Sequence, residues 1–133
     1  EQYTLHLAID NYFGGEELEL NNEPEDANSI EVERTIQGYI HPVGDIDFYR
    51  LEISERHLGN LQILLSGIMK VNTDMKLYDA DMNELGHAAA QREEGVERLI
   101  FEGLPGLYYI RVYDNDGKGS NYRDKYQLAI FRQ

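Results

Sequence analysis

The sequence contains no cysteine and no tryptophan, and only three of its 133 residues are proline. Without cysteine, the chain can form neither a disulfide nor a thiolate metal site. No apolar run approaches the ~20 residues that a membrane-spanning helix needs. Basic residues are also few, because twelve Lys and Arg stand against twenty-five Asp and Glu, for a net charge of -13. Such a surface repels nucleic acids and anionic membranes, so neither is expected as a partner, whereas cations are attracted.

Apolar and polar residues alternate along most of the chain, at the spacing typical of half-buried β-strands. Turn-forming Asp, Asn and Gly separate these runs about every 10 to 15 residues, and no long stretch has a helical period. The pattern therefore predicts an all-β domain, an antiparallel β-sandwich or barrel of about seven to nine strands. The predicted strands cover residues 3–9, 36–40, 49–53, 61–65, 75–77, 99–101, 108–113 and 126–130.

Several segments between these runs are predicted to be turns. Residues 79–83 and 114–119 carry Asp at the spacing that opens an EF-hand loop, but Ala90 and Lys125 stand where the bidentate Glu should be. Asp, Asn and Gly are common turn formers, so turns are expected at both places. Residues 23–28 suit one helical turn with Pro near its start. Residues 85–95 are short of apolar periodicity and are expected to form a loop or a single turn.

The two ends of the chain share a Tyr-x-Leu-x-aliphatic pattern, at residues 3–7 and 126–130. Two ordinary strands explain this match, because alternation makes such matches common. Alternatively, residues 1–9 are the last strand of a preceding copy, and residues 10–15 are a linker. We therefore expect two parts, an N-terminal strand and linker at residues 1–15 and the sandwich at residues 16–133. The whole chain is expected to be a piece of a longer protein, and the second interpretation implies tandem copies in that protein.

Signatures of enzymes are absent from the sequence. It has no Gly-x-Ser-x-Gly elbow, no cysteine nucleophile and no phosphate-binding loop. Its four histidines, at positions 6, 41, 57 and 87, have no zinc-site spacing. A pair of catalytic carboxylates on a sandwich stays open as a third alternative, but no catalytic residue is assigned and the chain is not expected to be an enzyme.

The most informative segment is acidic, with six carboxylates and no base between Glu16 and Asp26. Side chains at alternate positions share one face if this segment is extended. A second pair of carboxylates stands at alternate positions just before the strand at residues 49–53. Calcium prefers six to eight oxygen ligands, so two such clusters meeting in space would form a calcium site. The alternative is a solvated acidic loop. The candidate ligands are Glu17, Glu19, Asn21, Asn22, Asp45 and Asp47.

A second candidate site lies on the strand at residues 108–113. Its more apolar set, Tyr108, Ile110 and Val112, is expected to face the core. The opposite face then carries two tyrosines and an arginine, residue types that are enriched at binding hot spots. Cross-strand packing of these side chains is the alternative. The candidate partner-binding residues are Tyr109, Arg111 and Tyr113.

Four motifs in order carry a resemblance to a known family. They lie at residues 44–51 (GDIDFYRL), 77–85 (LYDADMNEL), 105–113 (PGLYYIRVY) and 126–130 (YQLAI). From about residue 16 to residue 131, the chain resembles the bacterial pre-peptidase C-terminal domain and is similar to the collagen-binding domains of clostridial collagenases. The resemblance implies a jelly-roll-like β-sandwich appended to secreted peptidases and other exported proteins.

The same resemblance implies a calcium site where the acidic segment meets the turn that contains Asp45 and Asp47. The segment 17–22 (ELELNN), with Ala27-Asn28 following, looks like the family's calcium segment, although Asn22 replaces Asp and Leu20 stands where Pro is common. The resemblance also places Tyr113 and Tyr109 on a strand that collagen-binding relatives use to bind their partner.

The expected function is therefore that of a non-catalytic calcium-binding accessory module, secreted or on the cell surface. Such a module would attach to an extracellular protein or polymer, which the resemblance suggests is collagen-like. The alternative is a structural spacer or tandem repeat with no ligand beyond calcium.

Overall fold

The computed structural model describes residues 21–89 and 96–133 of the chain. In these residues there are nine β-strands, a single 3-10 turn and no α-helix. The turn is η1 (Pro24–Asp26), and the strands are β1 (Asn28–Ile30), β2 (Arg34–Ile40), β3 (Ile46–Ile53), β4 (Asn60–Ser66), β5 (Thr73–Asp79), β6 (Glu84–Ala89), β7 (Val96–Glu102), β8 (Gly106–Asp114) and β9 (Asn121–Arg132).

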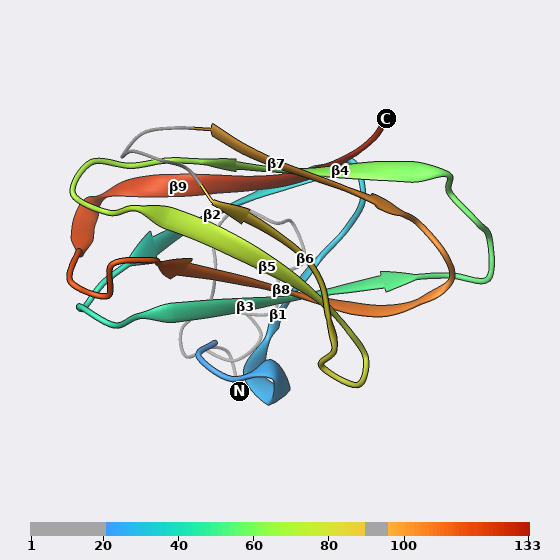
Figure 1. Cartoon of the computed structure of the whole chain (residues 1–133), viewed down its shortest axis with the longest axis horizontal. Helices are drawn as coiled ribbons and strands as arrows, with labels where there is room; N and C mark the ends of the chain where they lie inside the picture. Colours follow the sequence, from blue (N-terminus) through green and yellow to red (C-terminus); the bar gives the residue numbers. More distant parts are fainter. Residues whose placement is uncertain (1–20, 90–95) are drawn as a thin grey trace, which may run out of the picture.

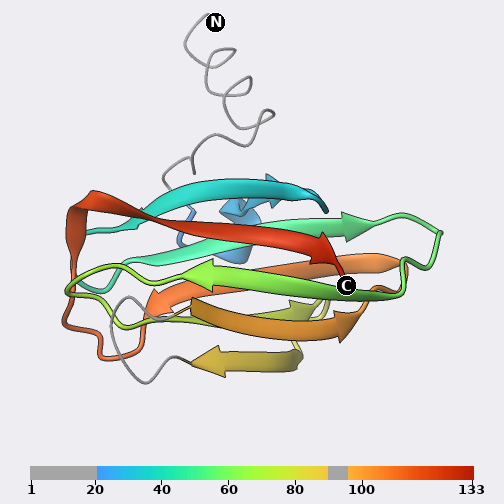
Figure 2. The ribbon, with the colours of Figure 1, turned by 90° about the horizontal axis from the view of Figure 1, so that it is seen from above.

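The strands form two sheets that stack face to face (Figures 1 and 2). One sheet has five strands in the order β1-β3-β8-β5-β6, and the other has four in the order β2-β9-β4-β7. All neighbours are antiparallel except β1, which runs parallel to β3. The predicted fold class, an all-β sandwich of about seven to nine strands, is confirmed.

Most of the core between the sheets consists of the alternate side chains that the sequence pattern predicted, joined by Ile30, Ile68 and Val71 from segments where no strand was predicted. On β8, Ile110 and Val112 are fully buried and Tyr108 is 8% exposed, so the predicted core face of this strand is confirmed. Each fully buried Leu, Ile or Val contributes roughly 1.5–3 kcal/mol through the hydrophobic effect, which makes this alternation the main source of stability.

The predicted turn at residues 79–83 is confirmed as the connection between β5 and β6. Its carboxylate, Asp79, accepts hydrogen bonds from the backbone N–H of Asp81 and Asn83, both at 2.9 Å, and from the Asn83 amide at 3.1 Å. The hydrogen bonds from Asn83 are the main reason that the pKa of Asp79 lies below its ordinary value. Asp79 thus organises the turn from within.

Two strands were not predicted. Strand β6 occupies part of the segment 85–95, where a loop or single turn was expected, so that prediction is wrong for residues 85–89. The segment has no alternating pattern of its own, and its strand conformation depends on tertiary packing. A Cβ added to Gly86 would lie 3.1 Å from Leu99 of β7, so β6 packs closely against the other sheet. Strand β1 pairs over only three residues, too few to leave a local signal.

The predicted strand at residues 3–9 and linker at 10–15 lie outside the described residues, as do Glu17 and Glu19. The division of the chain at residues 15 and 16 therefore stays a prediction.

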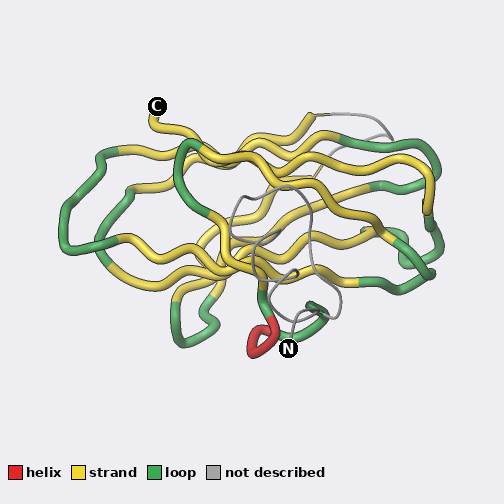
Figure 3. The backbone as a smooth tube through the Cα atoms, turned by 180° about the vertical axis from the view of Figure 1, so that it is seen from behind, coloured by secondary structure: helices red, strands yellow, loops and turns green. Residues whose placement is uncertain are grey.

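The connections β2–β3, β4–β5 and β8–β9 gather at one end of the sandwich, on the left in Figure 1 and drawn as green tube in Figure 3. A backbone hydrogen bond of 2.9 Å from Asn115 to Asn72 ties two of them together. Strand β3 begins at this end, with Asp45 immediately before its first residue and Asp47 as its second residue.

Candidate functional site

The end of the acidic segment lies against the start of β3. The Phe48 N–H donates to the Asn21 carbonyl at 2.8 Å. The side-chain amide of Asn22, with its nitrogen turned toward β3, donates to Asp45 Oδ1 at 3.0 Å and to the Ile46 carbonyl at 2.7 Å. The structure thus brings Asn21 and Asn22 to the turn that contains Asp45. The predicted calcium site requires that these two oxygen-rich segments lie together.

Asn21 is fully buried, and its amide nitrogen lies 3.3 Å from Asn28 Oδ1. Asn28, the second residue of the Ala27-Asn28 pair, is itself 6% exposed and pairs with β3 through its strand. A buried amide pair fixes the direction in which the acidic segment approaches β3.

Asp45 is 7% exposed and accepts a hydrogen bond of 3.1 Å from the His41 N–H to its Oδ2. Burial raises the pKa of Asp45 above its ordinary value, although hydrogen bonds from the backbone of His41 and Ile46 act in the opposite direction. Ionised Asp45 therefore carries a desolvation cost that a neighbouring positive charge would remove.

Asp47 points into the sandwich and is fully buried. The Tyr126 hydroxyl, on β9 of the opposite sheet, donates to Asp47 Oδ2 at 2.5 Å. The hydroxyl of Tyr49 lies 2.5 Å from that of Tyr126, so Tyr49 donates in turn to Tyr126. These three side chains form a buried polar chain that links the two sheets. The chain fixes the orientation of the Asp47 carboxyl group at the start of β3.

Sequence analysis missed Tyr49 and Tyr126 as parts of this site. Each belongs to an alternating apolar set, so the sequence identified them as core residues, and only their hydroxyl groups distinguish them from Phe. Of the six predicted metal ligands, four are described, and all four lie around the start of β3. Within residues 21–89 and 96–133, no group of three or more His, Asp or Glu has a metal-binding arrangement. A complete ligand set therefore needs further oxygens.

The second candidate site lies on the outer face of the five-stranded sheet, where β8 runs between β3 and β5. Tyr109, Arg111 and Tyr113 are all partly buried there, facing away from the core as predicted. The Arg111 guanidinium lies 4.5 Å from the centroid of the Tyr113 ring, and Lys76 of β5 lies 6.0 Å from it. Cation–π contacts therefore order this face.

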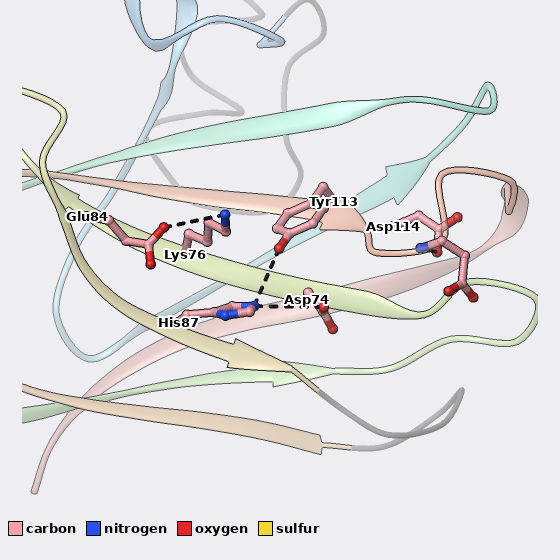
Figure 4. A network of polar contacts seen from close by, with 7 residues as sticks. Asp74, Lys76, Glu84, His87, Tyr113 and Asp114 are labelled. Atoms are coloured by element: carbon pink, nitrogen blue, oxygen red, sulfur yellow. Dashed lines mark hydrogen bonds and ion pairs between the residues drawn. The ribbon is translucent and has the colours of Figure 1, made fainter.

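A polar network extends from Tyr113 to the sheet edge (Figure 4). The Tyr113 hydroxyl lies 3.5 Å from His87 Nε2, which is 4.0 Å from the buried Asp74 carboxylate. The pKa of Tyr113 is raised, mainly by burial and next by the negative charge of Asp74, while Arg111 acts in the opposite direction. Tyr113 is thus a neutral hydrogen-bonding group. The cross-strand packing that was the alternative is therefore present on this face. Tyr109, Arg111 and Tyr113 nevertheless remain partly exposed to solvent.

No protein-family model matches the chain, and no curated protein matches it. In the described residues, no helix has the length and apolar character needed to cross a membrane.

Solved structures do match. The pre-peptidase C-terminal domain of collagenase from Bacillus anthracis is 24% identical with a TM-score of 0.64, over 83% of this chain and 99% of that one. PliG of Aeromonas hydrophila, a periplasmic inhibitor of g-type lysozyme, is 15% identical with a TM-score of 0.49, over 77% of this chain and 93% of that one. A putative secreted protein from Eubacterium rectale is 14% identical with a TM-score of 0.49, over 88% of this chain and 44% of that one. The predicted resemblance is confirmed at the level of the fold, which this chain shares with a pre-peptidase C-terminal domain.

Proposed function

We propose that the chain is a calcium-binding accessory module of an exported bacterial protein, with no catalytic activity of its own. The observation that carries this proposal is that Asn21 and Asn22 lie against Asp45 and the first residues of β3, the strand that also carries Asp47. The shared fold supports the accessory role, because the B. anthracis domain belongs to a collagenase.

The surroundings of Asn22 suit a hard cation. Its amide reaches one carboxylate oxygen of Asp45 and the carbonyl oxygen of Ile46. If the amide turned over, three oxygens would gather at this point, and they would repel one another unless a cation lay among them. Calcium would supply positive charge to two buried carboxylates, and Glu17 and Glu19 would complete its oxygen ligands.

Calcium should raise the melting temperature of the chain, measured by calorimetry in excess calcium and in chelator. An ion that binds only the folded state stabilises it by about 2.7 kcal/mol when its free concentration is 100 times the dissociation constant. Asp45→Asn should abolish most of the rise. Without calcium it should cost little, because the variant also removes the desolvation cost that raises the pKa of Asp45.

The matched control is Asp81→Asn, which makes the same change at an exposed position of the β5–β6 turn and should keep the full rise in melting temperature.

The effect of calcium should also depend on pH. Protonated Asp45 cannot bind calcium, and its raised pKa brings protonation closer to neutral pH. The calcium-dependent rise should therefore shrink as the pH falls through that pKa. Equal melting temperatures in calcium and chelator would refute the site.

A second function, attachment to an extracellular protein or polymer such as a collagen-like fibre, is favoured by the partly accessible Tyr109, Arg111 and Tyr113. Rings and a guanidinium on one rigid sheet offer stacking and hydrogen bonds at low entropic cost. A spacer without a partner is the alternative.

Tyr109→Ala should weaken binding to immobilised fibrous collagen by ~1–3 kcal/mol if this face is the hot spot. Tyr113→Phe keeps the ring over Arg111 and tests the hydroxyl alone. The control is Ile100→Ala, an exposed residue of the opposite sheet. If collagen binds and both tyrosine variants bind it as the wild type does, the face is not the site. If no fibrous protein binds, the spacer is favoured.

A further inference from the structure

A concavity of about 700 Å³ lies at the loop end of the sandwich, between the β4–β5 and β8–β9 connections. Its lining includes Met69, Lys70, Lys118, Tyr122 and Arg123. None of these residues belongs to the calcium cluster or to the Tyr109, Arg111 and Tyr113 face.

The walls of this concavity are fixed before any ligand binds. The Asn121 amide donates to the Met69 carbonyl at 3.0 Å, which joins the two connections. A Cβ at Gly119 would overlap the Lys70 carbonyl oxygen, so the two backbones are in direct contact. Lys118 is held through its N–H, which donates to the Asp114 carboxylate at 2.9 Å. A site built on such walls loses little conformational entropy on binding.

Basic side chains outnumber carboxylates in the lining of this concavity, on a chain whose net charge is -13. Three of its twelve basic residues line the concavity. Within the two described ranges, no ion pair reaches Lys118 or Arg123. The carboxylate that lines the same wall, Asp124, accepts a hydrogen bond from Asn121 at 3.0 Å. The two basic side chains therefore stay available for an anionic group.

An aromatic ring stands beside these charges. Tyr122 is 64% exposed, which is high for a tyrosine on a strand, and the Arg123 guanidinium lies 5.6 Å from its ring centroid. The His41 ring lies 5.6 Å from the same ring and supports it from the β2–β3 connection. Tyr122 thus offers a flat face next to a cationic group.

We propose that this concavity binds an acidic saccharide. Lys118 and Arg123 would hold its carboxylate or sulfate group, and Tyr122 would stack on the apolar face of a sugar ring. A peptide is the weaker fit, because only Met69 and Tyr122 offer apolar surface, whereas peptide grooves rely on several apolar anchors. The polar remainder of the lining suits the hydroxyl groups of a sugar.

The test is a titration of the isotope-labelled chain, followed by amide chemical shifts, with four probes. Hyaluronan hexasaccharide carries uronate groups alone, and chondroitin sulfate hexasaccharide carries uronate and sulfate. Chitohexaose is neutral, and poly-glutamate is an acidic peptide. We expect saturable shifts in residues 118–124 with at least one acidic saccharide, and about tenfold weaker binding of chitohexaose and poly-glutamate. The acidic saccharide that binds more tightly identifies the anionic group.

Lys118→Gln and Arg123→Gln should each weaken that binding about five- to tenfold, since each removes a charge-assisted contact. Arg98→Gln, an exposed position on β7, removes the same charge away from the concavity and should leave the affinity unchanged. Unchanged melting temperatures will show that the variants fold. The proposal is overturned if neither acidic saccharide gives saturable shifts, if either control probe binds as tightly, or if Lys118→Gln and Arg123→Gln lose no more affinity than Arg98→Gln.

Discussion

Replacing Asp114 with alanine should lower the free energy of unfolding by about 3 kcal/mol, because several backbone donors lose their acceptor at once. The Asp114 carboxylate is 7% exposed and accepts four N–H groups. They belong to Asn72 at 3.0 Å, Asp116 at 3.4 Å, Lys118 at 2.9 Å and Gly119 at 2.6 Å. One side chain therefore closes the β8–β9 connection and fastens it to the end of the β4–β5 connection.

Urea denaturation measures this loss. Asp116→Ala is the matched control, because it removes a carboxylate from an exposed position of the same loop and should change stability by less than about 0.5 kcal/mol. Asp114→Asn should fall between the two, since its amide oxygen keeps some of the donors while its NH₂ group faces the others. Equal stabilities of Asp114→Ala and Asp116→Ala would show that the four hydrogen bonds do not hold the loop.

Tyr126→Phe should lower the free energy of unfolding by about 2 kcal/mol, although it removes a single oxygen atom. The variant removes the hydrogen bond of 2.5 Å from Tyr126 to Asp47 and the hydroxyl contact of 2.5 Å between Tyr126 and Tyr49. Removing a hydrogen bond from a buried polar group is costly, because the group is shielded from water.

Tyr122→Phe is the control for this second variant, since it removes a hydroxyl from an exposed ring and should be nearly neutral. Chemical denaturation of both variants in chelator keeps calcium out of the comparison. A cost below about 0.5 kcal/mol for Tyr126→Phe would contradict the structural role assigned to the Tyr49–Tyr126–Asp47 chain, since even one ordinary hydrogen bond contributes that much.

Most of the fold could be predicted because its strands bury one face and expose the other. On β8, Tyr108, Ile110 and Val112 alternate with more polar residues, so the core face follows from the sequence. Strand β6 could not be predicted in this way. It lies at a sheet edge, its residues are small or exposed, and its strand conformation depends on pairing with β5 and packing against Leu99.

The residue types of the candidate calcium cluster could be predicted from the sequence, but the hydrogen bonds that hold its side chains in place could not. Oxygen-rich segments can be recognised from composition and spacing, and the structure places the described ones together. The hydroxyl of Tyr126 could not be assigned to Asp47, because the two residues lie on different sheets and 79 positions apart in the chain.

The four hydrogen bonds of Asp114 could not be predicted for another reason. Composition predicts a loop there, but it does not say which side chain closes the loop.

The order of strands in the two sheets has a consequence for biosynthesis. Each sheet has a C-terminal strand in its interior, β8 in the five-stranded sheet and β9 in the four-stranded sheet. Before these two strands leave the ribosome, β3 lacks its antiparallel neighbour, β5 pairs only with β6, and β2 has no neighbour in its sheet. Pairing over such sequence separations is slow, because the entropy of closing long loops is lost first. Folding of this sandwich must therefore follow translation of β8 and β9, and until then the nascent chain exposes apolar strands to chaperones.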